Sequence, residues 1–300
     1  MISRRAVLAG AAATLALPGA RPARAAMPPG VIRLPDLEAP GLLPRRVDLW
    51  VPPGQTGPLP LLIMHDGQNL LDPALAYGGT TWGVAETVNK LVAAGTIPPV
   101  MVAGVWSTAQ RWADYAPAAM LDRLPAAIRA QAAAVIGGPA LQPRYTDALA
   151  DRLVPQLRQR FAIAPGKVAI AGSSMGGLVS LASLAQRPDV FGAAACLSTH
   201  WPLIGLEPVA PEAVQAAIAG FIADALGPPR GRRLWLDHGD QGLDQHYAPY
   251  QSVADAALAR AGWQPGVDLV SRRFPGTGHN EASWAARLAL TFTFLFKGLA

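Results

Sequence analysis

The sequence is poor in cysteine and in charge. One cysteine, Cys196, stands among its 300 residues, so no disulfide can form within the chain. Its neighbours are mostly alanines, which favours a small buried side chain over a reactive thiol. Charged residues make up 15% of the chain, and no run of basic residues is longer than two. There is also no zinc-finger or RNA-binding signature, so nucleic acid is not expected as a partner.

The chain also lacks an apolar run long enough to span a bilayer, and this decides how its N-terminus is interpreted. Arg4 and Arg5 precede an apolar segment over residues 6–17, and residues 23–25 then form a small-x-small cleavage site. This pattern predicts a twin-arginine signal over residues 1–25, and therefore an exported protein, periplasmic or secreted. Residues 1–25 hold four arginines and no acid, so the formal net charge of +5 falls to +1 without them. No integral membrane segment is expected in the mature chain.

The rest of the chain, residues 26–300, alternates between strand and helix patterns and has no obvious central linker. With 51% hydrophobic residues, it can bury the core of a single domain. Strands are expected over residues 46–51, 59–65, 100–106, 167–172, 193–198, 233–237 and 267–274. Helices are expected over residues 83–94, 145–161, 175–186, 211–226, 247–261 and 281–296. Continuous apolar strands are typical of an α/β fold, with a mostly parallel central sheet, helices on both faces, and one or two antiparallel strands at the first edge.

One connection is longer than a crossover needs. Residues 107–144 are rich in alanine and proline, with scattered arginines, aspartates and aromatics. Loop-length statistics allow two interpretations, which the sequence does not separate. The segment is either a cap-like excursion over the fold or a long surface loop with a helix near residues 124–135.

A serine stands at a sharp turn between a strand and a helix. Residues 172–176, Gly-Ser-Ser-Met-Gly, lie between the apolar run 167–171 and the helical run from Gly177. This is the context of a nucleophile elbow, in which the central serine is lifted to where a histidine can take its proton. Glycine on either side leaves the turn unobstructed. Ser174 is therefore the candidate nucleophile.

The base should follow the nucleophile and an acid in the chain order of this architecture. Five histidines are present, and His279 alone lies in the loop after the last expected strand, directly before the C-terminal helix. Glycines before it allow the loop to bend back over the sheet edge, and Asn280 can cap the helix that follows. We therefore predict His279 as the base.

The acid should follow the penultimate strand, where three aspartates compete. Asp237 ends that strand, Asp240 lies in a glycine-flanked turn, and Asp244 stands where a helix begins and could equally be a simple N-cap. Spacing alone leaves this choice open.

An oxyanion hole needs two backbone N–H donors. The first is expected from Met175, the residue after the nucleophile. The second should come from the loop after an early strand, where Gly67 would allow close approach of a substrate and Gln68 would donate its N–H. The other interpretation of this loop is an ordinary turn closed by the side chains of Asp66 and Asn69.

Aromatic side chains follow several of the expected strands. Ligands of open parallel sheets bind at the carboxyl ends of the strands, so these side chains could form an apolar rim around Ser174. Taken singly, each is more typical of packing. The candidate substrate-binding residues are Trp201, Trp106, Tyr247 and Trp82, with Trp112 on a neighbouring loop.

Several short motifs follow one another along most of the mature chain. They are residues 64–70 (Met-His-Asp-Gly-Gln-Asn-Leu), 81–84, Arg111 with Tyr115 and Pro117, 145–155, 172–177, Leu243-Asp244, and 278–281 with Trp284. With these motifs the sequence resembles the putative esterase family of α/β-hydrolases, which includes enterochelin esterases, esterase D, feruloyl esterases and mycolyltransferases. The resemblance implies the α/β-hydrolase fold. Because Leu-Asp recurs in relatives at this place, it also implies Asp244 as the acid, with Asp240 as the alternative.

The expected function is that of an exported serine carboxylic ester hydrolase that acts through an acyl-enzyme on a small aromatic or hydrophobic ester, without a cofactor. One alternative is an acyltransferase that passes the acyl group to an alcohol. Another is a binding module that keeps the fold without turnover. A metal-dependent hydrolase centred on His65, Asp66 and His238 is a further alternative, although these residues lack a recognised ligand spacing.

Overall fold

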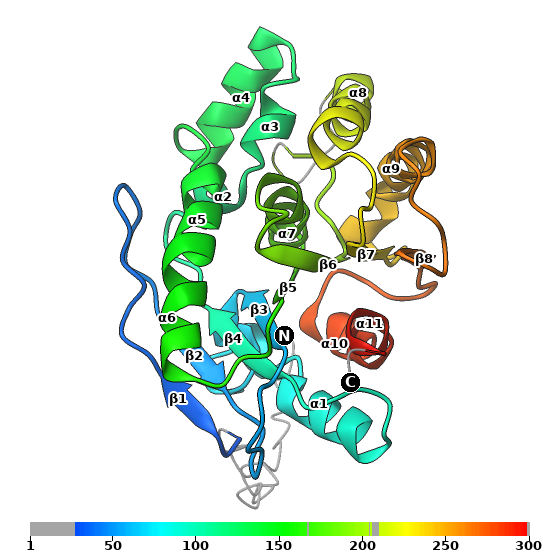
Figure 1. The fold of residues 1–300 in the computed structure, drawn as a ribbon. Helices are drawn as coiled ribbons and strands as arrows, with labels where there is room; N and C mark the ends of the chain where they lie inside the picture. The colour runs from blue at the N-terminus through cyan, green and yellow to red at the C-terminus, as the bar shows by residue number, and fades with distance from the viewer. Residues whose placement is uncertain (1–27, 167, 204, 206–209, 299–300) are drawn as a thin grey trace, which may run out of the picture.

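The computed structural model describes residues 28–166, 168–203, 205 and 210–298. Its centre is a sheet of eight strands in the order β1-β2-β4-β3-β5-β6-β7-β8 (Figure 1). The strands are β1 (Val31–Arg33), β2 (Val47–Trp50), β3 (Leu61–His65), β4 (Met101–Val105), β5 (Val168–Ser173), β6 (Phe191–Leu197), β7 (Arg233–His238) and β8 (Leu269–Arg273). β2 pairs antiparallel with both β1 and β4, and the remaining pairs are parallel. The predicted α/β class, with antiparallel strands at the first edge, is confirmed.

The central strands are buried on both faces. In β3, Leu61 and Ile63 pack into one apolar cluster, and the intervening Leu62 packs into the cluster on the opposite face. Successive side chains of a strand point to opposite faces, so a strand between two helical layers has to be apolar throughout. This is the reason that continuous apolar runs predicted the central strands, whereas the short and half-exposed β1 was missed.

Helices cover both faces (Figure 1). One layer holds α1 (Val84–Ala93), α10 (Glu281–Ala285) and α11 (Leu288–Phe296), whose apolar side chains pack on the same face as Leu62. The larger layer holds α2 (Arg111–Tyr115), α3 (Ala118–Leu121), α4 (Ala126–Ile136), α5 (Gln142–Ala148), α6 (Val154–Arg160), α7 (Met175–Gln186), α8 (Pro211–Phe221) and α9 (Ala248–Arg260).

Three expected helices are not regular α-helices throughout. The one expected over residues 211–226 ends in a π-helical turn, η4 (Ile222–Leu226), directly after α8. The helix expected over residues 145–161 contains a π-helical turn, η3 (Leu149–Leu153), between α5 and α6. Pro155 follows that turn and has no N–H to donate, so a wider turn before it avoids the clash of a regular α-helix. The segment expected as one helix over residues 281–296 is divided into α10 and α11, and Arg287 lies between them with its side chain buried.

The long connection over residues 107–144 is mostly helical. It forms α2, α3 and α4 and enters α5, and α3 packs against α8 while α2 packs against α5 and α7. Tyr115 and Met120 are fully buried within it. These helices therefore share the apolar core of the larger layer.

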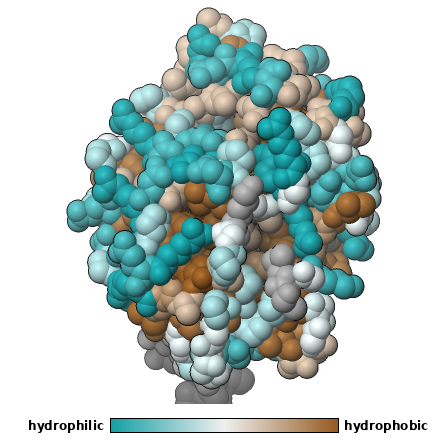
Figure 2. All heavy atoms as spheres, viewed as in Figure 1, coloured by the Kyte–Doolittle hydropathy of each residue, from teal (hydrophilic) through white to brown (hydrophobic). Residues whose placement is uncertain are grey.

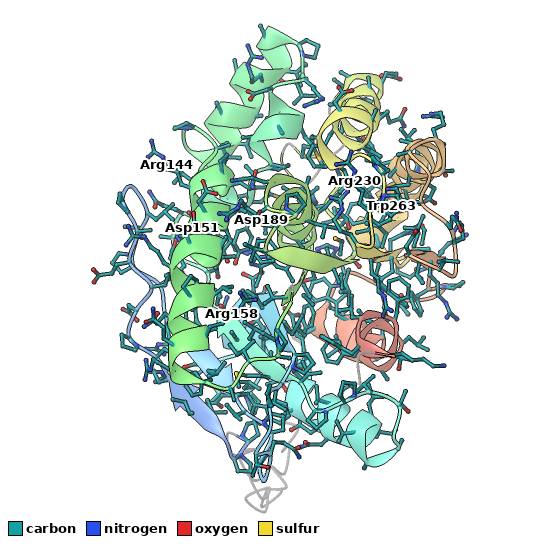
Figure 3. All side chains as sticks on the ribbon, in the orientation of Figure 1. Arg144, Asp151, Arg158, Asp189, Arg230 and Trp263 are labelled. Carbon is teal, nitrogen blue, oxygen red and sulfur yellow. The ribbon has the colours of Figure 1, made fainter. Side chains whose placement is uncertain are left out.

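An ion-pair cluster on the surface joins two elements of this layer. Arg187, at the end of α7, lies 2.8 Å from Asp151 of η3 and 2.8 Å from Asp189. Figure 3 labels both aspartates.

Among the described residues, none of the helices has both the length and the apolar character that a membrane span requires. The predicted signal over residues 1–25 lies outside the described residues.

Candidate active site

Ser174 stands at a strained turn between β5 and α7. Its backbone angles are φ 58° and ψ −124°, outside the regions that a serine ordinarily adopts. Its N–H bonds the Leu197 carbonyl of β6 at 2.9 Å, and its carbonyl accepts from the N–H of His200 at 3.2 Å. A Cβ at Gly172 would lie 2.8 Å from backbone atoms of Gly176, so the turn requires glycine there. The half-buried Ser174 is thus presented at the carboxyl edge of the sheet.

His279 and Asp244 are in direct contact. Asp244 lies in η5 (Gly242–His246), a 3₁₀ turn after β7, and His279 lies in the loop between β8 and α10. Their Oδ1 and Nδ1 atoms are 2.6 Å apart, and the Asp244 side chain is fully buried. Asn280 accepts a hydrogen bond from the Ser283 N–H at 2.9 Å, which confirms the expected cap of α10 and fixes the loop that carries His279.

The environment of Asp244 determines which nitrogen of His279 carries the proton. Burial alone would raise the pKa of the Asp244 carboxyl, but hydrogen bonds from His279, Ser198 and the Gly239 N–H outweigh it and hold that pKa below its ordinary value. An ionised carboxylate only accepts hydrogen bonds, so His279 Nδ1 must be the protonated nitrogen. The Nε2 atom of a neutral His279 is then left with the lone pair that a base needs.

The other two aspartates have different partners. Asp240 accepts from Arg273 and from the Gly276 N–H, both at 2.8 Å, and so ties the loop after β7 to the loop after β8. Asp237 is fully buried and accepts from Arg287 and from the indole N–H of Trp235. Of the three aspartates, Asp244 is the one in contact with His279.

Strand pairing brings the Ser174 turn and Asp244 to the same edge. β5 pairs with β6 so that Ser173 lies opposite Leu197, and β6 pairs with β7. Ser198, the residue after β6, contacts Asp244 through its Oγ atom at 2.6 Å. Ser174 is therefore linked through the end of β6 to the Asp244 and His279 pair.

The two expected oxyanion donors lie in the first turns of helical segments. Met175 is the first residue of α7, and Gln68 lies in the 3₁₀ turn η1 (Gly67–Asn69) after β3. Among the described residues, neither backbone N–H has a hydrogen-bond partner. The Gln68 side chain pairs with Ser107, donating to its Oγ at 2.7 Å and accepting from its N–H at 3.2 Å.

An ion pair holds the loop that carries Gln68. Arg111 donates two hydrogen bonds, each 2.8 Å long, to the two carboxylate oxygens of Asp66. Burial would raise the pKa of Asp66, but the Arg111 guanidinium lowers it below its ordinary value. Asp66 itself adopts a left-handed conformation, with φ 54°. The ion pair therefore stabilises a strained residue two positions before Gln68.

The aromatic candidates lie deeper than a rim. Trp201, Tyr247 and Trp82 are buried, and Trp201 donates to Gln251 at 2.9 Å. Trp106 is half-buried beneath Arg46 and donates to Asp48 at 2.8 Å. Contact of these four side chains with a substrate stays a prediction.

Next to His279, the structure groups another set of rings. Tyr247 lies edge-on to His279, His200 lies edge-on to Tyr247, and the half-buried Trp112 lies edge-on to His200, with centroids 5.8 to 6.0 Å apart. Burial lowers the pKa of His200 to about 4, so its ring is neutral. Trp112 is thus a partly exposed aromatic side chain that is connected to His279 through the rings of His200 and Tyr247.

The residues of the metal-dependent alternative contact other groups. His65 Nδ1 bonds the Tyr145 hydroxyl at 2.8 Å, Asp66 is held by Arg111, and His238 Nδ1 lies 2.6 Å from the Gly239 carbonyl. In the described ranges, no three side chains of His, Cys, Asp or Glu are grouped as ligands of a metal ion would be.

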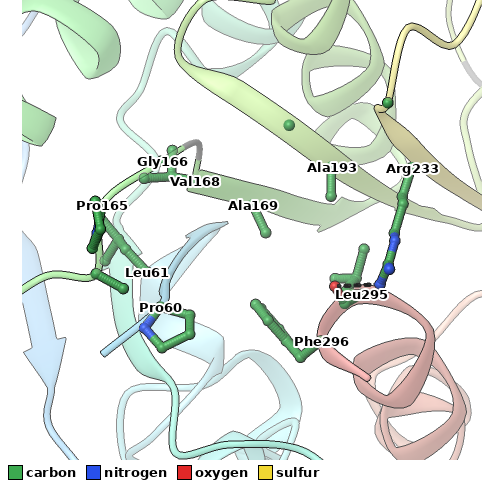
Figure 4. Close-up of a pocket in the computed structure, with 13 residues that line it drawn as sticks. Pro60, Leu61, Pro165, Gly166, Val168, Ala169, Ala193, Arg233, Leu295 and Phe296 are labelled. Carbon is green, nitrogen blue, oxygen red and sulfur yellow. Dashed lines mark hydrogen bonds between the residues drawn. The ribbon is translucent and has the colours of Figure 1, made fainter. Parts of the chain in front are cut away.

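A cavity lies at the other edge of the sheet. Its volume is ≈ 360 Å³, and Leu61, Val168, Arg233 and Phe296 are among the residues that line it (Figure 4). Figure 2 shows the molecule from the same side as Figure 1, with hydrophobic residues gathered near the centre of the view. These lining residues begin the parallel strands or end α11, whereas Ser174 follows the end of β5. The cavity is therefore remote from Ser174.

Three residues around Asp244 had no predicted role. Ser198 contacts Asp244, Trp284 packs edge-on against His279 with centroids 5.0 Å apart, and Arg287 bonds the hydroxyl of Thr277 at 2.8 Å. The one sequence signal for Arg287 was a charged residue inside an otherwise apolar helical run. Nothing in the local pattern singled out Ser198.

The family of the chain follows from comparison with known proteins. Residues 43–295 match the family described as putative esterase. The chain belongs to the putative esterase family of α/β-hydrolases. The resemblance inferred from its motifs is thereby confirmed.

Solved structures agree on the fold. An enterobactin esterase from Shigella flexneri superposes with a TM-score of 0.62 at 16% identity over 90% of this chain, which spans 60% of that protein. The BES protein from Bacillus cereus gives 0.63 at 14% identity over 92% of this chain and 98% of its own. An IroE-like serine hydrolase from Shewanella oneidensis gives 0.61 at 16% identity, over 88% and 78% of the two chains. No curated protein sequence matches this chain.

Proposed function

We propose that this chain is a serine carboxylic ester hydrolase that acts through an acyl-enzyme. The observation that carries the proposal is the buried, ionised Asp244 in a 2.6 Å contact with His279, on the same sheet edge as the strained Ser174. An acid that orients a histidine within reach of a serine hydroxyl is the arrangement that activates serine for acyl transfer. Membership of an esterase family supports the same reaction.

The reaction proceeds in two halves. The Ser174 oxygen attacks the acyl carbon of the ester, and its proton passes to His279 Nε2. When the tetrahedral intermediate collapses, the bond from carbon to the alkoxy oxygen breaks and His279 returns the proton to the departing alcohol. Water then attacks the carbonyl carbon of the acyl-enzyme, with His279 again as the base. The bond to the Ser174 oxygen breaks, the carboxylic acid product leaves, and Ser174 regains its proton from His279. Asp244 stays ionised throughout and stabilises the imidazolium.

The oxyanion of both intermediates is held by backbone N–H groups. Met175 and Gln68 are the donors of this proposal, because neither N–H is engaged with another described residue. Such donors act strongly because they are aimed at the developing charge before the reaction begins. The Arg111 and Asp66 pair keeps the Gln68 turn in place.

We propose small aromatic or hydrophobic esters as substrates. Two solved relatives of this fold are a ferulic acid esterase and the enterobactin esterase found with 2,3-dihydroxy-N-benzoyl-glycine, and both names include a compound with an aromatic ring. The half-buried Trp112 next to His200 could contact such a ring. We expect Trp112→Ala to lower the preference for aryl over alkyl esters, measured as a ratio of kcat/KM values. An unchanged ratio would count against this substrate class.

Hydrolysis of aryl esters by Ser174→Ala and Ser173→Ala tests the reaction. Both changes remove one hydroxyl from the same turn, and Ser173 ends β5 as a buried residue. Ser174→Ala should lose on the order of 10⁶-fold in kcat, while Ser173→Ala should keep most of the activity. Equal losses would contradict the assignment of Ser174. Products with and without added alcohols show whether water or an alcohol accepts the acyl group.

Export by the twin-arginine route is a separate proposal. It rests on Arg4, Arg5 and the cleavage pattern that follows them. Replacement of both arginines by lysine keeps the charge and should leave the uncleaved precursor in the cytoplasm. Normal export of that variant would contradict the proposal.

A further inference from the structure

Ser198 lies where the acid, the histidine loop and α10 meet. It follows β6, its side chain is fully buried, and its φ of 42° places it in the left-handed region. Its N–H donates to Asp237 Oδ1 at 3.2 Å. A serine in this conformation is strained, so the surrounding contacts must hold it there.

The hydrogen bonds at the Ser198 hydroxyl fix the direction of its proton. Its Oγ accepts from the indole N–H of Trp284 at 2.9 Å and lies 3.4 Å from Arg287 Nη1. Indole and guanidinium groups are donors only, so neither can receive the hydroxyl proton. Asp244 Oδ2, at 2.6 Å, is the acceptor that remains. Ser198 therefore donates to Asp244.

The Asp244 carboxylate is held at both oxygens. Oδ1 faces His279 Nδ1, while Oδ2 accepts from the Ser198 hydroxyl and from the Gly239 N–H, each at 2.6 Å. With Oδ2 fixed from two directions, rotation of the carboxylate away from His279 would break two charge-assisted hydrogen bonds. The orientation of the imidazole thus depends on groups that do not touch it.

The same cluster also holds the loop that carries His279. Arg287 donates to Asp237 at 2.5 Å and, through Nη2, to the Thr277 hydroxyl at 2.8 Å. Thr277 stands two residues before His279, and its carbonyl accepts from the N–H groups of Asp240 and Gln241. Ser198 is therefore the point at which the contacts of the acid and those of the loop converge.

We propose that Ser198 is a positioning residue, whose hydroxyl holds Asp244 in the orientation that His279 requires. This inference rests on the proposed serine esterase reaction. Ser198 neither contacts the substrate nor transfers a proton, so its loss should reduce kcat and leave KM nearly unchanged. The Gly239 N–H still holds Oδ2 in its absence, so the expected loss in kcat is about 10- to 100-fold, below that of Asp244→Ala.

Two substitutions separate the hydroxyl from the backbone strain. Ser198→Ala removes the hydroxyl and keeps an L side chain at φ 42°, whereas Ser198→Gly removes the hydroxyl and relieves the strain. Both should lose kcat to a similar extent. Ser183→Ala is the matched control, because Ser183 is an equally buried serine whose hydroxyl bonds Thr146 at 2.8 Å in the helical layer. It should keep wild-type kcat.

The NMR signal of the His279 Nδ1 proton gives a readout that is independent of turnover. In the wild-type protein the short bond to Asp244 should place this signal far downfield, and a His279→Asn variant assigns it. In both Ser198 variants we expect the signal to broaden or to move upfield. Wild-type kcat and an unchanged signal in these variants would overturn the inference, as would full recovery of kcat in Ser198→Gly alone.

The inference and the proposed function fail in different ways. If the wild-type protein hydrolyses no ester, the proposed function fails, and the NMR comparison still decides whether Ser198 orients Asp244. If the wild-type protein is active and the Ser198 variants match Ser183→Ala, the inference fails and the proposed function stands.

Discussion

At the scale of single residues, the account depends on what surrounds one carboxylate. Asp244 is fully buried, and it accepts from His279, Ser198 and the Gly239 N–H. Burial of a charge without partners is costly, but three donors compensate for it and keep the carboxylate ionised. Because the carboxylate is ionised, His279 holds its proton on Nδ1 and offers Nε2 as the base.

Substitution of the two candidate acids ranks their roles. Asp244→Ala should lower kcat for an aryl ester by about 10³- to 10⁴-fold, because His279 loses both its orientation and its counter-charge. Asp240→Ala should cost less than about tenfold, since Asp240 bonds Arg273 and the Gly276 N–H but does not contact His279. Steady-state kinetics of both variants gives the ranking. A reversed order would assign the acid to Asp240.

A buried histidine makes the stability of the fold depend on pH. Burial lowers the pKa of His65 from 6.5 to about 3, so His65 is neutral in the folded chain and is protonated on unfolding below its ordinary pKa. The unfolded state thus binds the extra proton, and the free energy of unfolding falls as the pH drops from 6.5 towards 3.

Urea unfolding at several pH values measures this contribution. Between about pH 6 and pH 4 the wild-type free energy of unfolding should fall by up to ~1.4 kcal/mol per pH unit on account of His65. His65→Gln, which has no titrating group, should show a shallower dependence by about that amount. Parallel curves for the two proteins would mean that His65 is not held neutral by the fold.

At the scale of elements, the turn from β5 to α7 places different demands on its two glycines. A Cβ at Gly172 would lie 2.8 Å from the backbone of Gly176, and backbone atoms cannot easily move away. A Cβ at Gly176 would first meet the His65 Cβ at 3.4 Å, which is an ordinary contact. Within the Gly-Ser-Ser-Met-Gly motif, the backbone therefore requires glycine at position 172 but leaves space for a Cβ at position 176.

Alanine substitution of each glycine tests this difference. Gly172→Ala should destabilise the fold by about 3 kcal/mol or more, because the added methyl group overlaps the turn. Gly176→Ala lies within α7 and should change stability by no more than about 1 kcal/mol, since alanine is the better helix former. Thermal unfolding monitored by circular dichroism compares them. Equal destabilisation would contradict the geometry of the turn.

Helix and strand patterns predicted most elements, and their failures have local physical causes. The seven expected strands are all present. The central strands β3, β4 and β5 are buried throughout and therefore apolar, whereas the edge strand β8 is mostly exposed. The pattern over residues 281–296 could not reveal the break between α10 and α11, since Arg287 is drawn inward by Asp237 and Thr277. These partners precede it by 50 and 10 residues, beyond the reach of a local pattern.

At the scale of the whole molecule, sheet topology brings residues that are distant in sequence to one edge of the sheet. The parallel strands β5 to β8 end at one edge, so Ser174, Asp244 and His279, which follow three of these strands, are brought to the same edge. The elbow motif predicted Ser174 as the nucleophile, and chain order predicted His279 as the base. Chain order left three aspartates open, and the family resemblance favoured Asp244, the one that contacts His279.

Other parts of the site could not be predicted from the sequence. Ser198 and Arg287, whose side chains approach within 3.4 Å, are separated by 89 residues and carry no common motif. The burial of Trp201 and Tyr247 likewise follows from packing between helices and strands distant in sequence. A position after a strand therefore indicated which edge these aromatics occupy, but not how deep they lie.

Covalent labelling of the whole chain tests the central claim most directly. An aryl fluorophosphonate should react once with the protein, forming a bond from the Ser174 oxygen to phosphorus and releasing fluoride. Intact mass spectrometry should show a single adduct, peptide mapping should place it on Ser174, and esterase activity should fall in proportion to labelling. An adduct on another residue, or full activity after complete labelling of Ser174, would contradict the account.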